Sequence, residues 1–446
     1  GGKISNAAHD TFLKIEQPLP YNVFGGISLK TLTEKIFARA LKRETVKAND
    51  IVNVPVDRLL INDFVGAIVF RHFESLGAEA VVNPDNILLG IDHRIPPAEI
   101  KFADSLKFCR DKCRQYHIER FAEIGRHGIG HQLMVQDFVL PGEVALGTDS
   151  HSTMYGGIGA FATGITSSDA AIIMATGEIW LQVPASIRVN VRGQLNKGVT
   201  AKDLSLKVLT LAPLHTFIYK AIELGGEGIE ALSISGRLAA ANMLAETGAK
   251  NIIMAADEKT AAFIGKPSGE LQMDRPDADA QYETTYEVDA SELPPLLSYP
   301  HTPENVKPIG EGAEGLPIHQ AFIGSCANGR IEDLEQALEI LRGRKVHKDV
   351  RLIVVPASQK VMLEATRRGL VEELLVAGAA IMTPSCASCA GSGPGLIGAG
   401  ERCISTTNRN FKGRMGNTES EVFLGSAYAV AAAAVCGYIT DPRQFL

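Results

Sequence analysis

Residues 384–393 read PSCASCAGSG, with Cys386 and Cys389 separated by two small residues and followed by glycines. No bulky side chain shields these thiols, and the glycines let the backbone wrap closely around a bound group. A third cysteine, Cys326, lies far upstream in a similar stretch, GSCANGR at residues 324–330. Three thiols, two close together and one brought in from a distance, suit a metal centre with one coordination position open. An open position indicates chemistry rather than a structural metal site.

The composition is that of a globular protein with several domains. A chain of 446 residues is too long for one ordinary hydrophobic core, so about two to four domains are expected. Hydrophobic residues make up 45% and charged residues 21% of the chain. The net charge of −7 and the aromatic content of 6% argue against a nucleic-acid groove, which needs basic surface and stacking side chains. We therefore expect no nucleic-acid partner.

The seven cysteines are too few and too scattered for a disulfide framework, so we expect a reducing, cytoplasmic compartment. Cys109 and Cys113 lie four positions apart amid apolar residues, and buried packing explains them better than metal binding. No apolar run is long enough to span a bilayer, and the N-terminus lacks the pattern of a secretory signal, so no membrane association is expected. Residues 1–25 carry little pattern and are interpreted as an extension.

The first α/β unit is expected over residues 26–186. A buried strand at 87–91 ends in Asp92 and His93, and polar groups at a strand end are where α/β folds place their sites. Taken alone, such a pair is more often part of a surface turn, so this signal is weak by itself. The interpretation gains support only from a second strand end with the same character.

That second strand end is the stretch GTDSH at residues 147–151, which follows an apolar triplet; His131 precedes it. A serine hydrolase triad is excluded there, because Asp149, Ser150 and His151 are consecutive and neighbouring side chains of an extended segment diverge. The glycine-rich residues 155–160 predict a helix start whose free amides could receive a carboxylate or a cluster sulfur.

The second α/β unit is expected over residues 187–297. Its pattern predicts helices near 201–211 and 215–224 and a strand near 231–235. Asn242 and Glu246 are four apart on a helix and so share one face. An exposed polar face is the simpler interpretation of that pair. Residues 266–318, rich in Pro, Gly, Asp and Glu, are interpreted as a connection over the surface.

The third unit, residues 298–446, contains strand patterns that end just before each thiol group. Strands at 319–324 and 379–383 lead into Cys326 and into the 384–393 stretch, and parallel strands bring such ends to one edge. A further strand at 404–407 leads into Asn408, Arg409 and Arg414. Arginines at such an edge can hold carboxylates bidentately, although a solvated basic turn has the same composition.

Taken in order, these motifs resemble the aconitase superfamily of hydro-lyases. The nearest branch is that of 3-isopropylmalate dehydratase large subunits and related hydratases. The resemblance runs from about residue 26 to the C-terminus, and the ordered set is specific although each motif alone is weak. It implies an α/β fold of three α/β/α units around a central iron–sulfur cleft, without the mobile fourth domain of the family. The motifs are Asp92-His93, residues 130–132, 147–151, Asn242 with Glu246, 324–330, 386–389, and 408–411 with Arg414.

The resemblance also implies a cofactor and roles for single residues. It implies a [4Fe–4S] cluster bound by Cys326, Cys386 and Cys389, with the fourth iron acting as a Lewis acid on the substrate. Within the catalytic set, His93 would be the proton donor, oriented by Asp92. The implied catalytic residues are Asp92, His93, His131, Asp149, Ser150, His151 and Glu246. The implied substrate-binding residues are Arg409, Arg414 and Asn242, and Asn328 and Asn408 would lie against the cluster.

Members of this family deprotonate carbon with a serine on a Gly-Ser-Ser-Arg-type loop, and this sequence has no such loop. We therefore expect a separate small subunit that supplies the serine base. The expected substrate is a 2-hydroxy di- or tricarboxylate, first 3-isopropylmalate, then homoaconitate, citrate or isocitrate, dimethylmalate or methylcitrate. Ala327 and Gly329 depart from the usual motif and bear on substrate identity. Alternatives are a cluster-free RNA-binding relative, opposed by the acidic balance, and structural zinc, opposed by a set of only three thiols.

Overall fold

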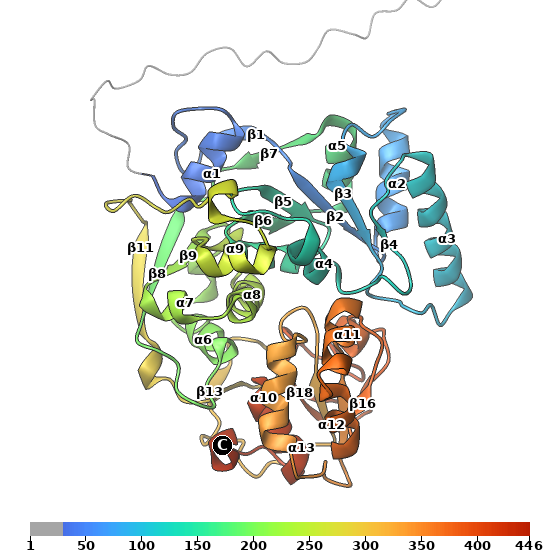
Figure 1. The fold of residues 1–446 in the computed structure, drawn as a ribbon, viewed down its shortest axis with the longest axis vertical. Helices are drawn as coiled ribbons and strands as arrows, with labels where there is room; N and C mark the ends of the chain where they lie inside the picture. Colours follow the sequence, from blue (N-terminus) through green and yellow to red (C-terminus); the bar gives the residue numbers. More distant parts are fainter. Residues whose placement is uncertain (1–29) are drawn as a thin grey trace, which may run out of the picture.

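The computed structural model describes residues 30–446, and the predicted extension at 1–25 lies outside the described residues. The described chain is an α/β fold built on three sheets of four or more strands, with a separate two-stranded ribbon formed by β1 (Ile51–Pro55) and β7 (Glu178–Gln182). Figure 1 shows the first unit in blue to cyan, the second in green to yellow and the third in orange to red. The predicted fold class is confirmed, whereas the residues at which the three domains divide stay a prediction.

The first sheet has five parallel strands in the order β4-β3-β2-β5-β6. Its strands are short and almost wholly buried, as expected of a parallel sheet covered on both faces. The strands are β1 Ile51–Pro55, β2 Arg58–Asn62, β3 Ile87–Gly90, β4 Phe121–Ala122, β5 Val144–Gly147, β6 Phe161–Gly164 and β7 Glu178–Gln182, of which β1 and β7 form the ribbon. The helices are α1 Leu32–Ala40, α2 Gly66–Ser75, α3 Ile100–Gln115, α4 Gly130–Asp137 and α5 Ser167–Thr176.

The second sheet is also wholly parallel, in the order β10-β9-β8-β11. The predicted helix at 215–224 is wrong, because residues 221–225 form a buried strand, and short apolar runs cannot be assigned by periodicity alone. The predicted strand at 231–235 is wrong as well, since two helices meet there. The elements are β8 Ser186–Arg192, α6 Ala201–Val208, β9 Ala221–Gly225, α7 Glu227–Ala231, α8 Ile234–Met243, the 3-10 helix η4 Leu244–Thr247, β10 Asn251–Met254, α9 Glu258–Ile264 and β11 Thr284–Asp289.

The third sheet has seven strands in the order β13-β12-β18-β17-β14-β15-β16, parallel except for β12 and β13 at one edge. Residues 266–318 are therefore more than a surface connection, because they supply β11 to the second sheet and β12 and β13 to the third. The elements are β12 Leu296–Ser298, β13 Val306–Pro308, β14 Gln320–Ile323, α10 Ile331–Leu341, β15 Arg351–Val354, α11 Gln359–Arg367, α12 Leu370–Ala377, β16 Ala380–Ile381, β17 Arg402–Ser405, β18 Glu421–Leu424 and α13 Ala427–Cys436.

The glycine-rich stretch after β5 joins the first two units. It forms the 3-10 helix η2, Ser150–Ile158, which ends at Gly159 in the left-handed conformation. The predicted helix start at 155–160 is thus wrong: the glycines end a helix. The lack of a side chain at these glycines permits close packing, because a Cβ on Gly156 would lie 1.7 Å from the backbone oxygen of Ile252 in the second sheet. The same stretch packs along α8.

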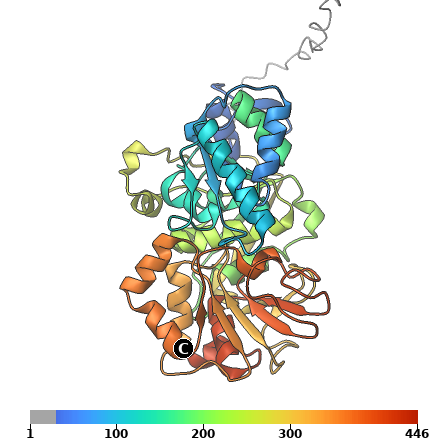
Figure 2. The same ribbon diagram turned by 90° about the vertical axis from the view of Figure 1, so that its right-hand side faces the viewer.

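The carboxyl ends of strands in the first and third units meet, since the backbone N–H of Cys386 donates to the carbonyl oxygen of Asp92 over 2.7 Å. Figure 2 shows the orange-to-red third unit on one side, the blue-to-cyan first unit on the other and green helices between them. Among residues 30–446, no helix is both long enough and apolar enough to cross a membrane.

Candidate active site

Strand ends of the third sheet carry the three predicted metal-ligating cysteines. Cys326 follows β14, Cys386 and Cys389 follow β16, and β15 pairs with both strands in parallel. All three cysteines are free thiols, and Cys326 and Cys389 are buried. The sequence-based expectation that these thiols share one sheet edge agrees with this topology.

The spacing and acidity of the thiols describe the kind of group they could hold. A single tetrahedral ion with metal–sulfur bonds of about 2.3 Å needs sulfur atoms about 3.8 Å apart. Within residues 30–446, the three thiols do not form a set whose sulfur atoms all lie within 4.8 Å of one another. Burial raises the pKa of Cys326 to about 12, and burial together with Asp92 and the other two thiols raises that of Cys386. The donor set thus fits a cationic core larger than one ion.

The turn that carries Cys326 is held from within by a buried arginine. Arg330, which is 3% exposed, donates from Nη2 to the carbonyl oxygen of Cys326 and from Nη1 to that of Ala327, both over 2.7 Å. Its Nε donates to Oε1 of Gln132 over 2.9 Å. Ser325, next to the cysteine, has a φ of 74°, a left-handed conformation that costs about 1–3 kcal/mol for a residue other than glycine. The turn is therefore a constrained structure.

A paired histidine follows β3. Nδ1 of His93 lies 2.6 Å from Oδ1 of Asp92 and 3.4 Å from Oδ1 of Asp63. Asp63 also accepts hydrogen bonds from the backbone N–H groups of His93 and Arg94, each 3.1 Å long. Burial opposes protonation of His93, but the charge of Asp92 and hydrogen bonds to both carboxylates outweigh it and raise its pKa well above the ordinary value. Burial also raises the pKa of Asp92, so the Asp92–His93 pair holds a proton that it could donate.

Asp149, after β5, lies between two further histidines. Its Oδ1 is 3.0 Å from Nε2 of His131, whose Nδ1 meets the hydroxyl of Tyr155 at 2.9 Å. The same oxygen accepts the backbone N–H of His151 over 2.9 Å. Burial would raise the pKa of Asp149, but His131 and His151 hold it well below its ordinary value. Nε2 of His93 is 3.8 Å from the other carboxylate oxygen, so three histidines surround one carboxylate.

Glu246 joins the second unit to this cluster. Its Oε1 is 3.0 Å from Nε2 of His151 and accepts a 2.8 Å hydrogen bond from Nε of Arg409, which follows β17. Nη2 of Arg409 donates to Oγ of Ser150 over 2.8 Å. Burial would raise the pKa of Glu246, but His151 and Arg409 lower it. The face that carries Glu246 is therefore not the exposed polar face that is the simpler sequence interpretation.

Asparagines lie against one of the thiols. Sγ of Cys326 is 3.7 Å from Oδ1 of Asn242 and 3.9 Å from Oδ1 of Asn408, and the two amides are hydrogen-bonded to each other. Asn328 differs, because its Nδ2 donates to Asp333 and its buried Oδ1 has no partner among the described residues. An unpartnered buried oxygen beside the Cys326 turn is a polar atom that a bound group could satisfy.

Arg414 is not part of the Arg409 cluster. Its carbonyl oxygen lies against Gly391, just beyond Cys389, and its Nε is buried without a partner among residues 30–446. Oγ of Ser388 is likewise unpartnered. Ser388 lies inside the Cys386–Cys389 turn and the Arg414 backbone lies beside it, so both unpartnered atoms belong to residues of this region.

Several residues of this site are not recognisable in the sequence. Asp63 lies one strand away from His93, Tyr155 is hidden in the glycine-rich stretch, and Arg330 was expected only as part of a motif. Lys202 is fully buried and donates from Nζ to the carbonyl oxygens of Thr406 and Thr407, just before Asn408. Burial lowers the pKa of Lys202 to about 8. The only signal for Asp63 was its place at the end of β2, the same position that marked Asp92.

The sequence matches the Aconitase family (aconitate hydratase) over residues 34–437. It is 44% identical to 3-isopropylmalate dehydratase large subunit 1 of Methanopyrus kandleri over 419 residues, 94% of this chain and 100% of that protein. It is 43% identical to 3-isopropylmalate dehydratase large subunit of Wolinella succinogenes over 420 residues, 93% of this chain and 99% of the relative. Identity to 2,3-dimethylmalate dehydratase large subunit of Eubacterium barkeri is 42% over 416 residues, again covering 93% and 99%.

Proposed function

This chain belongs to the aconitase family, and we propose that it is the large subunit of a hydro-lyase that removes and re-adds water on a 2-hydroxy dicarboxylate, with 3-isopropylmalate as its substrate. The observation that carries the proposal is the meeting of three free thiols, a paired histidine and a carboxylate-binding arginine at the ends of parallel strands. The names of the relatives, which the chain matches over 99% or more of their lengths, support the same reaction class and substrate.

We assign Cys326, Cys386 and Cys389 as the ligands of a [4Fe–4S] cluster. Thiols whose pKa values are raised by burial become thiolates only beside a strong cationic centre. Among residues 30–446 these three sulfur atoms do not all lie within 4.8 Å of one another, which is evidence against a single ion held by all three. When bound, such a cluster with one iron free of protein ligands supplies a Lewis acid for the hydroxyl and a carboxylate of the substrate. Asn242 and Asn408, at 3.7 and 3.9 Å from the Cys326 sulfur, would pack beside it.

Proton handling falls to the residues around Asp149. His93, kept protonated by Asp92 and Asp63, has its Nε2 directed at Asp149 and is the assigned donor to the departing hydroxyl group. His131 and His151 lower the pKa of Asp149 and so favour its carboxylate form. This group of histidines around Asp149 could therefore hydrogen-bond the water that leaves the substrate. The two histidines are positioned by Tyr155 and Glu246.

Substrate carboxylate binding is assigned to Arg409. Glu246 engages its Nε, while Ser150 accepts from Nη2, so its guanidinium is fixed in orientation beside the histidine cluster. Arg414 and its unpartnered Nε form a second carboxylate-binding position on the Cys389 side. Two arginines on two sides of the thiol edge suit a dicarboxylate better than a monocarboxylate.

We propose a small-subunit partner that supplies the serine base. The relatives named as large subunits support a two-subunit enzyme, and within residues 30–446 no serine lies in a Gly-Ser-Ser-Arg stretch. The partner would also cover the cleft and exclude water from it. The printed name of one relative, 2,3-dimethylmalate dehydratase large subunit, makes dimethylmalate the second candidate substrate.

One geometric observation favours a different metal chemistry. The ligand atoms of Asp92, His93 and Cys386 lie within 4.8 Å of one another and could hold a single ion. A mononuclear site would remove the proton-donor role from His93. Iron and acid-labile sulfide in about equal amounts support the cluster, whereas one zinc or iron without sulfide supports the mononuclear site.

The function is tested with the chain co-purified anaerobically with its small subunit. The absorbance of the conjugated alkene product is followed with 3-isopropylmalate, 2,3-dimethylmalate and citrate as separate substrates. The proposal requires turnover of 3-isopropylmalate in the complex and little turnover by the isolated chain. Turnover of none of these acids by a complex that contains iron and sulfide contradicts it.

A further inference from the structure

A partly open cavity lies at the carboxyl ends of β9 and β10 in the second sheet. Its volume is about 180 Å³, and it shares no residue with the candidate active site. Apolar cavities of roughly 150 Å³ hold a benzene-sized molecule, so this one has room for a small metabolite. In open parallel sheets, ligands commonly bind outside the carboxyl ends of the strands.

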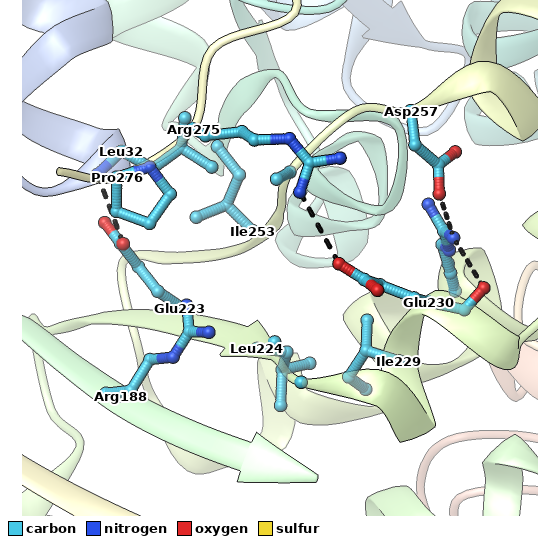
Figure 3. Close-up of a pocket in the computed structure, with 14 residues that line it drawn as sticks. Leu32, Arg188, Glu223, Leu224, Ile229, Glu230, Ile253, Asp257, Arg275 and Pro276 are labelled. Carbon is cyan, nitrogen blue, oxygen red and sulfur yellow. Dashed lines mark hydrogen bonds and ion pairs between the residues drawn. The ribbon is translucent and has the colours of Figure 1, made fainter. Parts of the chain in front are cut away.

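The cavity has an apolar middle and charged ends. Figure 3 shows Ile253, Leu224 and Ile229 between Glu223 and Arg188 on one side and Glu230 on the other, with Arg275 reaching across to Glu230. These aliphatic side chains can pack against an apolar group of a ligand. They cannot hydrogen-bond a polar group of a ligand. A ligand that fits must therefore be amphiphilic.

Arg188 is a cation without a counter-ion in this cavity. Its Nε donates to Oδ1 of Asn190 over 2.7 Å and its guanidinium carbon lies 5.9 Å from the centre of the Tyr282 ring, but it forms no ion pair with a carboxylate of the described residues. Glu223 is beside it but is already satisfied. It accepts hydrogen bonds from the N–H groups of Leu32 and Thr33, from Oγ of Ser186 and from the hydroxyl of Tyr282, which fill the acceptor sites of a carboxylate.

A second guanidinium is also incompletely paired. Arg237 is 1% exposed, and its Nη2 bonds to Asp257 and to the carbonyl oxygen of Glu230, but its Nε has no partner among residues 30–446. A buried unpaired donor is costly unless a bound group satisfies it. Arg275 and Glu230 form a loose pair, 3.5 Å apart, with both side chains more than half exposed. The cavity therefore has spare donors for an anion, whereas its loosely paired carboxylate, Glu230, is largely exposed at the other end.

We propose that this cavity is a binding site for a small carboxylic acid with a branched apolar tail, separate from the active site. The carboxylate accepts hydrogen bonds from Arg188, and the tail lies on Leu224, Ile229 and Ile253. An inorganic anion would satisfy the guanidinium and leave the apolar middle uncovered. Because Glu223 ties the start of α1 to the second sheet, a ligand beside it braces the junction of the first two units.

The test is calorimetric titration of the full-length chain with 4-methylpentanoate, with acetate and inorganic phosphate as comparison ligands. The proposal requires 4-methylpentanoate to bind at one site at least about tenfold more tightly than acetate or phosphate. Arg188→Gln removes the charged donor and should weaken binding by about tenfold or more. Ala255→Leu, which adds an isopropyl group to a residue that lines the cavity, should weaken it as well.

Two matched variants make the test specific. Arg192→Gln changes an exposed arginine on the same strand, whose pairing with Glu287 is 3.9 Å long, and should leave the affinity unchanged. Arg409→Gln removes the carboxylate-binding arginine of the active site and should also leave it unchanged. Affinity lost in Arg409→Gln but kept in Arg188→Gln would place the ligand in the active site and overturn the proposal. Equal binding of phosphate, or no binding of 4-methylpentanoate, overturns it too.

Discussion

Replacement of Arg330 by lysine should loosen the turn that presents Cys326. The guanidinium makes three hydrogen bonds to oxygen atoms, those of the Cys326 and Ala327 carbonyls and of Gln132, and a weaker one to Sδ of Met154. A lysine ammonium on this site keeps one of them and loses two. Hydrogen bonds from charged groups contribute about 1.5–3 kcal/mol each, so the turn should lose about 3 kcal/mol of its free energy of local opening. That loss corresponds to about a hundredfold faster opening.

Amide hydrogen exchange measures this opening directly. We expect the amides of residues 324–330 to exchange about a hundredfold faster in Arg330→Lys, while β8 and β9 keep their protection. Iron bound per chain after anaerobic reconstitution should fall in parallel, because the turn positions a ligand. The matched control is Arg342→Lys at the other end of α10, where the arginine is about half exposed and pairs with Glu373. Such an exposed pair contributes at most about 1 kcal/mol. Unchanged exchange in Arg330→Lys would refute the reasoning.

Three other changes follow from the same contacts. Asp63→Asn removes a charge beside His93, so the imidazole pKa, read from the NMR titration of labelled histidine, should fall toward its ordinary value; an unchanged titration would remove Asp63 from the site. Burial opposes protonation of His151, but hydrogen bonds to its carboxylate neighbours raise its pKa. The stability that protonated His151 contributes is therefore complete below about pH 6.5, the ordinary pKa, and is lost as the pH rises through the higher pKa of the folded state. Glu246→Gln should lower that pKa and flatten the loss, as measured by unfolding at several pH values. Cys403→Ala, a buried cysteine at the start of β17, should leave the iron content unchanged, and a clear drop in iron would mean that the ligand set is wrong.

The part of this site that could be predicted from the sequence consists of residues that directly follow predicted strands. The sequence patterns for β14 and β17 end just before Cys326 and Asn408, and the parallel pairing of these strands puts both residues at one edge. A local rule, polar residues after a buried strand, was enough because the sheet supplies the long-range geometry. Asp63 follows β2 in the same way, but no strand is predicted from the sequence at residues 58–62, so the rule could not be applied there.

The parts that could not be predicted depend on packing between units. The glycines after Tyr155 look like a ligand-binding helix start, but their shape is set by the close approach of β10 in the second sheet. The apolar pattern of residues 221–225 fits a helix and a strand equally well. Only the pairing of this segment between β8 and β10 shows that it is a strand. The sequence does not show that Arg188 lacks a carboxylate partner, because that depends on the four hydrogen bonds that occupy the neighbouring Glu223.

The central claim is that three thiols from two strand ends hold one multi-iron core. The most direct measurement is iron and acid-labile sulfide per chain, with a Mössbauer spectrum, for the anaerobically reconstituted protein and for the three single cysteine-to-serine variants. The account predicts about four irons and four sulfides per chain with one iron site distinct from the others, and loss of most iron in each variant of Cys326, Cys386 and Cys389. Full iron and sulfide content in any one of these variants, or metal without sulfide in the parent chain, would contradict it.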